Sequence, residues 1–564
     1  MLIMQRLIKI LQRNVILVTM ILLGGIIRMF GLGAVPPSLN WDEISHGYNA
    51  YSILETGKDE WGERLPLIFR AYGDYKLPVY IYTTIPGVAV FGLSEFSVRL
   101  TSAVAGTLLI LFTYLLAFQL FNRRYVALLA ALFMTIEPWS FFLSRIAVEA
   151  NLALFFIVAG IWFTLSGLLR EKWWFILGAL FLGLSVWTYN SARVFVPLLL
   201  VTLIFIYRYE LIALWRAQKL FIIHYSLFII LFFLPMFYQL IIPAGQARYN
   251  WVAILDEGAI SQIDNRRNTS NLPGPLPRLL NNKIVYFLDS FGKNYLSYFS
   301  PDFLFSSGGT QYQFSVPGKG LIYPTEALLI AIGLLWIIKK RSKETTLILA
   351  WILLAPVAAS LTRESQHALR SIVMMPVPQI LSGVGLIVAW GWIRKKKLKS
   401  LALIIYIICL LYYAESYIGT YIGTYKTTYS WSWQYGYKEA VQFIKDHYNE
   451  YDQIIVTKKY GEPHEFVLFY LPWDPEKYVN DPNLIRFGQS EWYWVDRFDR
   501  FYFINDWQVP KMDSGKWIVE SGSEIPINSN TLLVTSPGNY PPGWKMIKTI
   551  NFLDNRPAFD ILEK

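Results

Sequence analysis

Long apolar runs recur along this sequence from residue 14 to about residue 420. Most of them approach the roughly 20 apolar residues that a helix needs to cross a bilayer. Because the hydrocarbon core offers no water to backbone groups, segments of this kind cross it as helices. The pattern predicts eleven spans, near residues 14–33, 99–120, 125–143, 151–169, 173–190, 193–208, 219–242, 322–338, 345–361, 369–393 and 399–420.

A twelfth apolar segment, PVYIYTTIPGVAVFGLS at 78–94, is short and is interrupted by a Pro-Gly pair. Cytoplasmic loops carry an excess of lysine and arginine, and this rule decides where the segment lies. If it does not cross, and if Arg6, Lys9 and Arg13 are cytoplasmic, every short basic loop is cytoplasmic as well. Those loops are FNRRY (121–125), residues 170–172, residues 208–219, KKRSKE (339–344) and RKKKLK (394–399). We therefore predict an interfacial or re-entrant helix at 78–94.

This topology predicts a multi-pass protein of the cell membrane with a cytoplasmic amino terminus. The first external loop is residues 34–98, and a long external loop is residues 243–321. We divide the chain into a transmembrane domain, 1–425, and an extracytoplasmic α/β domain, 426–564. In the latter, YKEAVQFIKDHY (437–448) has helical spacing, and four segments are typical of strands: QIIVTK, RFYFIN, KWIVES and TLLVTS.

Composition agrees with a membrane protein, since 54% of the residues are hydrophobic and only 16% are charged. A soluble domain has about 25% charged residues. The net charge of +11 does not indicate nucleic acid, because the basic clusters lie between apolar runs and act as topology signals. We therefore predict membrane lipids as neighbours and no nucleic-acid partner. The single cysteine, Cys409, excludes a disulfide within the chain.

Ionisable residues gather at the predicted outer ends of the spans. Asp42 and Glu43 follow the first span, in SLNWDEISHGYNAYS. A simpler interpretation is that Asn40 or Asp42 caps an amphipathic helix. Other outer segments contribute Asp74, Lys76, Arg145, Glu149, Tyr189, Arg193, Arg363, His367 and Arg370. Each one alone is explained by snorkelling or by a headgroup-level salt bridge, but as a set they predict a polar cavity.

Such a cavity suits transfer of a group from a phosphate carried by a lipid. A carboxylate can act as general base on an acceptor hydroxyl, and arginine or lysine can neutralise the phosphate. An aromatic-rich groove between spans can hold an isoprenoid tail. The sequence contains no P-loop and no glycine-rich dinucleotide motif, which argues against a soluble nucleotide as donor.

Four motifs in order resemble the GT-C glycosyltransferases, specifically the protein O-mannosyltransferase and aminoarabinose-transferase superfamily. They are WDE in the first external loop, YKLPVY before 78–94, SEFSVRLTSAVAGTL leading the second span, and SRIAVEAN in the next external turn. The resemblance covers roughly residues 10–400. It implies a membrane enzyme that moves a sugar from a polyprenyl-phosphate donor to a hydroxyl acceptor on the extracytoplasmic face, with inversion.

The resemblance also implies roles for single residues. Asp42 matches the catalytic acid, with Glu43 as its neighbour and Glu149 as the acid of the second external loop. Lys76 matches the basic residue of a Lys-Pro-Pro-like motif, in which this chain has Leu77 at the first proline. The candidates for the donor phosphate are Lys76, Arg145, Arg193, Arg363 and Arg370.

Further candidates are less specific. His46, Tyr189 and His367 are candidates for contact with the substrate, although the pattern favours a solvated interfacial histidine at His46. We predict no particular ion. If a divalent metal ion takes part, Asp42 and Glu149 are the residues that would hold it.

Three other functions compete with this one. A transporter or flippase of lipid-linked sugars predicts charges at mid-span and inverted repeats, and the charges here lie at span ends. A membrane scaffold that displays the tail does not explain the gathering of ionisable groups on one face. An oligosaccharide ligase differs from our prediction only in substrate, and the sequence identifies neither the sugar nor the acceptor.

Overall fold

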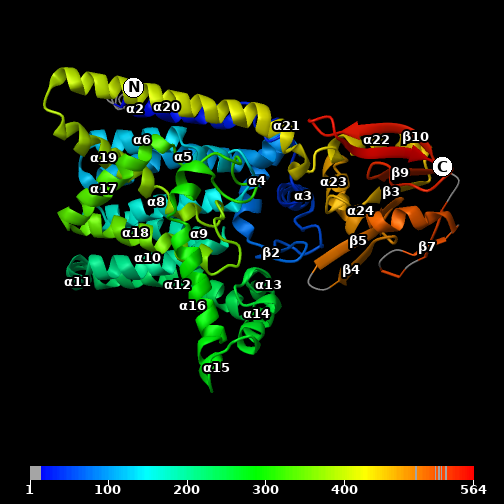
Figure 1. The fold of residues 1–564 in the computed structure, drawn as a ribbon, viewed down its shortest axis with the longest axis horizontal. Helices are drawn as coiled ribbons and strands as arrows, with labels where there is room; N and C mark the ends of the chain where they lie inside the picture. The colour runs from blue at the N-terminus through cyan, green and yellow to red at the C-terminus, as the bar shows by residue number, and fades with distance from the viewer. Residues whose placement is uncertain (1–13, 490–491, 515, 519–520, 523, 528–529) are drawn as a thin grey trace. The chain divides into compact units, whose positions relative to one another are not determined.

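The computed structural model describes residues 14–489, 492–514, 516–518, 521–522, 524–527 and 530–564 (Figure 1). The chain forms two compact units. The helical unit comprises Met1–Phe30, Ser102–Ser144 and Val148–Gly419, and the mixed unit comprises Gly31–Thr101, Arg145–Ala147 and Thr420–Lys564. These units do not follow the predicted division at residue 425, which was drawn from membrane topology and stays a prediction. The basic residues Arg6, Lys9 and Arg13 lie outside the described residues.

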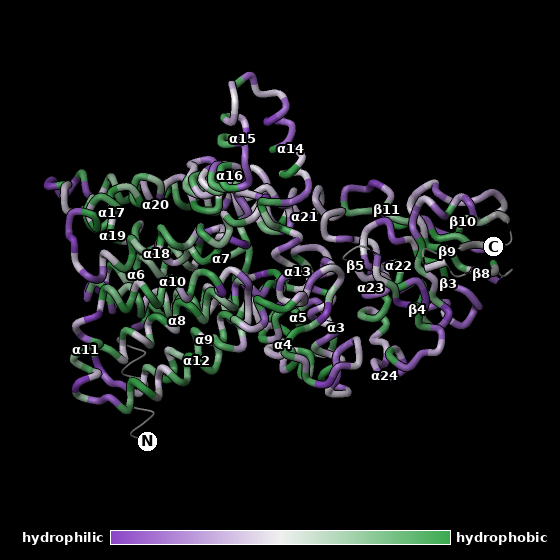
Figure 2. The backbone as a smooth tube through the Cα atoms, turned by 90° about the horizontal axis from the view of Figure 1, so that it is seen from below, coloured by the Kyte–Doolittle hydropathy of each residue, from purple (hydrophilic) through white to green (hydrophobic). Residues whose placement is uncertain are grey.

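Apolar helices make up most of the helical unit, and each predicted span coincides with one or two of them. They are α2 (Val15–Met29), α5 (Glu95–Phe121), α6 (Arg124–Ile136), α7 (Pro138–Leu143), α8 (Glu149–Leu169), α9 (Trp174–Val186), α10 (Asn190–Ile206), α12 (Lys219–Ile241), α17 (Ala327–Lys340), α18 (Lys343–Ser360), η3 (Ile372–Met374), α19 (Val377–Trp392) and α20 (Lys396–Thr420), whereas the intervening α11 (Arg208–Ala217) is polar. Figure 2 shows them as largely hydrophobic.

Six helical segments among the described residues are long and apolar enough to cross a membrane, or seven if α10 and α11, bent by 78°, form one span. The chain is therefore a multi-pass membrane protein. The predicted spans at 14–33, 125–143, 173–190 and 322–338 lie on shorter helices, so the number eleven stays a prediction. The helix at the predicted re-entrant segment, α4 (Pro78–Phe91), is also short, and its length alone does not distinguish it from these.

Glycines allow α8 and α9 to approach closely. A Cβ atom on Gly160 would lie 2.8 Å from the Leu182 side chain, and one on Gly178 would lie 2.5 Å from Oγ1 of Thr164. In a bilayer the hydrophobic effect does not drive helices together, because lipid tails are as apolar as the helix surfaces. Small residues favour association by letting the two backbones pack closely.

The predicted long loop at 243–321 is largely helical. It contains α13 (Pro243–Val252), α14 (Glu257–Asn268), α15 (Leu276–Leu280), α16 (Lys283–Ser297) and η1 (Asp302–Ser306), and η2 (Pro324–Glu326) precedes α17. Asp256 and Asn282 cap α14 and α16 through their side chains. The segment is tied to the predicted outer loop near 362 by a bridge between Ala253 and Thr362.

In the mixed unit, the amino-terminal part consists of α3 (Trp41–Thr56), the short strands β1 (Phe69–Arg70) and β2 (Tyr75–Lys76), and α4. A cluster of buried apolar side chains joins these elements: Ala50, Ile53, Phe69, Ile81 and Val88. The hairpin and both helices therefore share one small core, which fixes the loop residues between them.

The carboxyl-terminal part of the mixed unit has a seven-stranded mixed sheet within the described residues, ordered β10-β11-β9-β3-β6-β5-β4. Its strands are β3 (Gln453–Thr457), β4 (Ile485–Gln489), β5 (Trp492–Phe498), β6 (Phe501–Ile504), β9 (Thr531–Thr535), β10 (Lys545–Asn551) and β11 (Pro557–Glu563). The central strand, β3, pairs in parallel with both β6 and β9.

Most predicted elements of this part are present. The expected helix is α22 (Tyr437–Asp446), and three of the four expected strands are β3, β6 and β9. The fourth, β7 (Lys516–Ile518), pairs with β8 (Glu524–Pro526) in a separate sheet. Three more short helical segments, α21 (Lys426–Thr428), η4 (Tyr421–Tyr425) and η5 (Ser430–Trp433), precede α22, and η6 (Tyr448–Glu450), α23 (Pro463–Tyr470), α24 (Pro475–Val479) and η7 (Asp506–Ser514) follow it.

Candidate active site

The segment that carries Asp42 begins helix α3, and Asn40 is its cap. The Asn40 side chain accepts a hydrogen bond from the Glu43 backbone N–H at 3.0 Å, and the Asn40 N–H donates to Oε2 of Glu43 at 3.1 Å. This reciprocal arrangement is a capping box. Because Asn40 and Glu43 satisfy the helix end, the carboxylate of Asp42 is not needed as a cap.

Asp42 instead forms an ion pair with Lys76. The Lys76 ammonium lies 2.6 Å from Oδ1 of Asp42 and 3.8 Å from Oδ1 of Asp74. The β1–β2 hairpin holds Lys76 in place, since its backbone pairs with Phe69. The Asp42 side chain is 37% exposed, whereas that of Lys76 is 12% exposed. The structure thus brings together two of the predicted site residues and leaves Asp42 accessible.

Glu43 has a different environment although it is the next residue. Its side chain is fully buried, and Arg99 donates to both of its oxygens, at 2.8 Å and 3.0 Å. The Ala147 N–H also donates to it, at 2.8 Å. With the Asn40 bond, four donors converge on one carboxylate, which has about four lone-pair sites. Glu43 is therefore placed to hold the loop together.

Arg145 is buried within the mixed unit and contacts its backbone. It donates to the carbonyl oxygens of Gly31 and Val35 at 3.2 Å and 3.0 Å. It also donates to the Tyr421 hydroxyl at 3.3 Å, and its guanidinium lies 5.7 Å from the centre of that ring. These contacts give Arg145 a structural role in the segment after the first span.

The remaining cationic candidates belong to the helical unit. Arg193 on α10 is buried and donates to the Val186 carbonyl and to the Gln239 side chain at 2.6 Å. Arg370 is buried and pairs with Glu364 at 2.9 Å. Arg363 is more exposed and pairs with Asp256 of the long loop at 2.9 Å. Each of the three therefore has an internal partner.

The other candidates of the helical unit lie at helix ends or in the core. Glu149 is the first residue of α8 and is partly buried, and Tyr189 precedes α10 and is partly buried. His367 is buried, with its ring stacked on Phe314 at 5.2 Å between centroids.

The expectation of a solvated histidine at position 46 is wrong. His46 is fully buried, and its ring lies 5.0 Å from that of Tyr80 on α4. The reason is its position on α3, where it faces the helix that packs beside it. A sequence pattern that marks α3 as amphipathic does not tell which polar residue turns toward a neighbouring helix.

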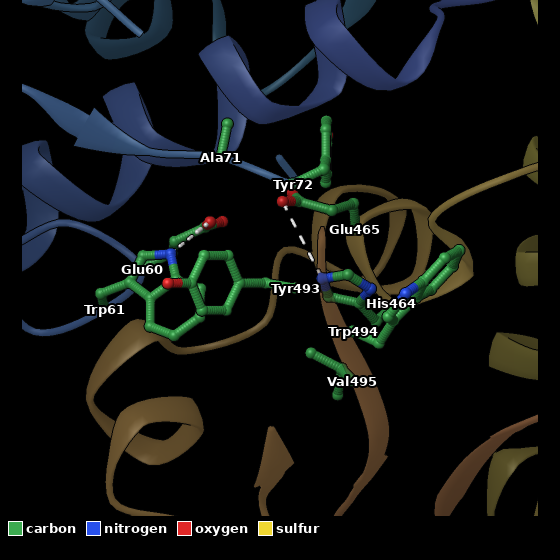
Figure 3. Close-up of a pocket in the computed structure, with 9 residues that line it drawn as sticks. All are labelled: Glu60, Trp61, Ala71, Tyr72, His464, Glu465, Tyr493, Trp494 and Val495. Carbon is green, nitrogen blue, oxygen red and sulfur yellow. Dashed lines mark hydrogen bonds and ion pairs between the residues drawn. The ribbon is translucent and has the colours of Figure 1, made fainter. Parts of the chain in front are cut away.

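The structure also has a pocket that sequence reasoning missed (Figure 3). Its lining comes from the predicted first external loop and from the carboxyl-terminal part, both within the mixed unit: Glu60, Trp61, Ala71, Tyr72, His464, Glu465, Tyr493, Trp494 and Val495. No motif in the tail marked these residues, because they become neighbours only through folding. The one available signal was the unusual density of aromatic residues in EWYWVDRF.

Burial changes the protonation of the acids around this pocket. It raises the pKa of Glu60 to about 7 and that of Glu465 well above its usual value, where the neighbouring Glu60 adds to the effect. Burial also raises the pKa of the adjacent Glu462 to about 8. The pKa of His464 is lowered well below its usual value by burial and by the nearby Arg486 and Lys458. Neutral forms are thus favoured in this cluster.

No group of three or more His, Cys, Asp or Glu side chains in the described part of the chain is arranged to hold a metal ion. Asp42 and Glu149, named as ligands if an ion takes part, lie in different compact units. The participation of a divalent metal ion therefore stays an open prediction.

Comparison with known proteins supports the resemblance seen in the sequence. Residues 18–244 match the model of the family described as dolichyl-phosphate-mannose-protein mannosyltransferase. No curated protein matches the sequence. The matched segment includes WDE, YKLPVY, SEFSVRLTSAVAGTL and SRIAVEAN, the motifs that carried the resemblance.

Solved structures share the fold at low sequence identity. ArnT from Cupriavidus metallidurans in the apo state has a TM-score of 0.52 at 13% identity, over 98% of this chain and 97% of that one. Its structure with bound undecaprenyl phosphate has the same score at 14% identity, covering 98% of each chain.

A third structure is the oligosaccharyltransferase AglB from Archaeoglobus fulgidus, in complex with an inhibitory peptide and a dolichol-phosphate. It has a TM-score of 0.50 at 15% identity, over 82% of this chain and 64% of that one. This chain thus spans less than two thirds of AglB but nearly all of ArnT. Residues 18–244 are thus similar in sequence to the protein mannosyltransferase family, and the fold of the chain is similar to that of ArnT.

Proposed function

We propose that this chain moves a sugar from a polyprenyl-phosphate donor to a hydroxyl acceptor on the extracytoplasmic face, with Asp42 as general base. The observation that carries the proposal is the pairing of an accessible Asp42 with Lys76 at 2.6 Å. The other acid of the motif, Glu43, is fully engaged by Arg99 and backbone donors. The matched family and the ArnT structure with undecaprenyl phosphate support a lipid-phosphate donor.

The reaction we propose is a single displacement. Asp42 accepts the proton of the acceptor hydroxyl while the hydroxyl oxygen forms a bond to C1 of the sugar. The bond between C1 and the phosphate oxygen breaks, and its electron pair leaves with the polyprenyl phosphate. Attack opposite the leaving group inverts the configuration at C1. The phosphate needs charge stabilisation more than it needs a proton, since it is a good leaving group.

Lys76 connects the two halves of this reaction. Its ammonium contacts Asp42 and lies near Asp74, and all three belong to the mixed unit. A donor phosphate would compete with Asp42 for that ammonium. We propose that the phosphate draws Lys76 toward itself, which frees Oδ1 of Asp42 to accept the hydroxyl proton once the donor is bound.

The membrane arrangement belongs to the same proposal. Eleven spans, a cytoplasmic amino terminus and an extracytoplasmic 426–564 place Asp42 and Lys76 on the extracytoplasmic side. The support is the distribution of basic loops, which agrees with the positive-inside rule only if 78–94 does not cross.

The test is transfer of radiolabelled sugar from a panel of polyprenyl-phosphate sugars in membranes that carry the native chain, Asp42→Asn or Glu55→Gln. Asparagine keeps the shape and removes the base, so turnover should fall by about 10²–10⁴-fold. Glu55 lies on the same helix but is exposed, so its variant should match the native chain. Equal turnover for Asp42→Asn and the native chain would disprove the role of Asp42.

A further inference from the structure

Helices α14 to α16 form an arm, residues 257–297, that projects from the helical unit. Figure 1 shows α16 running across the direction of α10, α12 and α18, with α14 and α15 at its far end. Helices α12 and α18 are each long and apolar enough to cross a membrane, and both belong to the same unit as the arm. In a bilayer that these helices cross, α16 therefore runs along the membrane and not through it.

Hydrogen bonds fix the base of the arm to the end of α18. The Tyr295 hydroxyl donates to the carbonyl oxygen of Leu353 in α18 at 2.7 Å. The Asn294 side chain donates to the carbonyl oxygen of Thr362, just beyond that helix, at 2.8 Å. The side chain of Leu353 is exposed, and an exposed leucine on a membrane-crossing helix contacts lipid tails. The carboxyl end of α16 thus lies beside a lipid-facing surface, near the level at which α18 ends.

The far part of the arm exposes many apolar side chains. Among those that are 40–71% exposed are Leu272, Leu276, Leu279, Leu280, Ile284 and Leu288. Ile284 and Leu288 lie one turn apart on the same face of α16, whereas Lys293 lies about 140° from Leu288 around the helix. An exposed apolar patch of this kind marks a surface that contacts a membrane or a protein partner.

The charge of the arm favours a membrane over a protein partner. Residues 265–288 contain four basic residues and no acidic residue: Arg266, Arg267, Arg278 and Lys283. Basic side chains near a membrane surface are attracted to the headgroups of acidic phospholipids. Exposed leucines beside basic residues are typical of helices that lie in the interface with their apolar face buried roughly 5–10 Å deep.

Aromatic residues mark the interface at the start of the same segment. Helix α13 follows α12 directly, and it exposes Tyr249 and Trp251. Tyrosine and tryptophan are enriched at both membrane–water interfaces, where their amphipathic rings lie at the level of the headgroups. The chain therefore leaves α12 at the membrane surface, passes through the arm, and meets the end of α18 at that surface again.

We propose that the arm is a membrane anchor that binds acidic phospholipids. The face of α16 with Ile284 and Leu288 inserts into the interface of the leaflet in which α18 ends, together with the leucines of α15. Arg266, Arg278 and Lys283 contact the headgroups. This interaction adds to that of the crossing helices and does not depend on sugar transfer. It also holds the loop after α18 at the membrane surface, because that loop is bonded to the base of the arm.

The test measures lipid contact at single positions of the full chain in nanodiscs. Cys409→Ser removes the native thiol, and Leu288→Cys or Lys293→Cys then carries a nitrobenzoxadiazole fluorophore. The nanodiscs contain phosphatidylcholine and phosphatidylglycerol, with a nitroxide quencher on the acyl chains. Quenching should be at least about twofold stronger at Leu288→Cys, because only this face of α16 enters the lipid. Both native side chains are exposed, so burial within the protein cannot explain a difference.

The preference for acidic lipid is tested by changing which lipid carries the nitroxide. At equal nitroxide content, quenching at Leu288→Cys should be stronger from phosphatidylglycerol than from phosphatidylcholine. The combined replacement Arg266→Gln, Arg278→Gln and Lys283→Gln should remove this preference, because it removes the charge that attracts the headgroup. Lys477→Gln is the matched control, since Lys477 is an exposed lysine outside the arm, and it should keep the preference.

Three results would overturn the proposal. Equal quenching at Leu288→Cys and Lys293→Cys would exclude insertion of the apolar face. A preference for phosphatidylglycerol that survives the combined replacement would exclude the role of the basic residues. Weak quenching at Leu288→Cys, with disulfide cross-linking of two unlabelled chains through that cysteine, would assign the surface to a second copy of the chain.

Discussion

Arg99 donates from Nε to Oε1 of Glu43 at 2.8 Å and from Nη2 to Oε2 at 3.0 Å, and both side chains are fully buried. The same arginine donates to the carbonyl oxygens of Leu32, Pro36 and Ser38. One ion pair therefore fastens the chain that enters α3 to the start of α5. Because Asp42 is the residue before Glu43, this pair also determines where Asp42 is presented.

Replacing Glu43 should damage folding more than chemistry. In Glu43→Gln, Arg99 keeps its buried charge without a carboxylate, and breaking one side of a buried ion pair costs about 3–5 kcal/mol. We expect a lower yield of folded chain and a lower melting temperature, measured by size-exclusion chromatography and thermal unfolding in detergent, while Glu55→Gln stays native. Glu43→Gln with native stability and no turnover would instead mark Glu43 as catalytic.

Replacing Lys76 should weaken donor binding. A hydrogen bond to a charged group contributes about 1.5–3 kcal/mol, so Lys76→Met should raise the donor KM by about 10–100-fold. The acceptor KM should change little, because we assign the ammonium to the donor phosphate and not to the acceptor. Lys58→Met is the matched control, since Lys58 pairs with Glu476 at 3.6 Å and is 45% exposed at its side chain. A donor KM that is unchanged in Lys76→Met would contradict the phosphate role.

The buried acid Glu462 should make stability fall as pH rises. Burial raises its pKa from 4.5 to about 8 in the folded chain, against the effect of Lys458 and a hydrogen bond from Trp492, while Glu60 adds to the increase. Between these two values the unfolded chain loses the proton and the folded chain keeps it, so stability decreases across that window and levels off above it. The loss for this group is at most about 5 kcal/mol.

Glu462→Gln removes the titration and keeps an acceptor for Trp492 Nε1, which donates to Oε1 of Glu462 at 2.5 Å. The variant should have the melting temperature of the native chain at pH 5 and a higher one at pH 8. The other buried titratable groups, Glu60, His464 and Glu465, are present in both chains, so their effects cancel in the comparison. If the melting temperatures of the two chains changed with pH by the same amount over this range, the raised pKa of Glu462 would be contradicted.

The sequence predicted several residues of the site, but it did not predict which residues they contact. The local pattern predicted a cap at Asn40 or Asp42, of which the structure has Asn40, and Lys76 and Asp42 were both predicted for one site. The partner of Glu43 was not predicted, because Arg99 lies 56 residues away in SEFSVRLTS, where it resembles an arginine at a span end. Arg145 and Arg193 were assigned to the donor phosphate by type and position, but contacts from distant segments occupy both. The pocket at Glu60 and Glu465 escaped notice for the same reason.

The proposed orientation can be tested with the single native cysteine removed. Cys409 lies on α20, and Cys409→Ser gives a chain without thiols into which one reporter is placed. In intact cells, a membrane-impermeant maleimide should label Lys477→Cys in the carboxyl-terminal part. It should label Lys397→Cys, in the basic loop 394–399, only after the membrane is permeabilised. Both positions are exposed, so burial cannot explain a difference. The reverse labelling pattern would show that the topology is inverted. Asp42 and Lys76 would then lie on the cytoplasmic side and the basic loops outside, against the positive-inside rule.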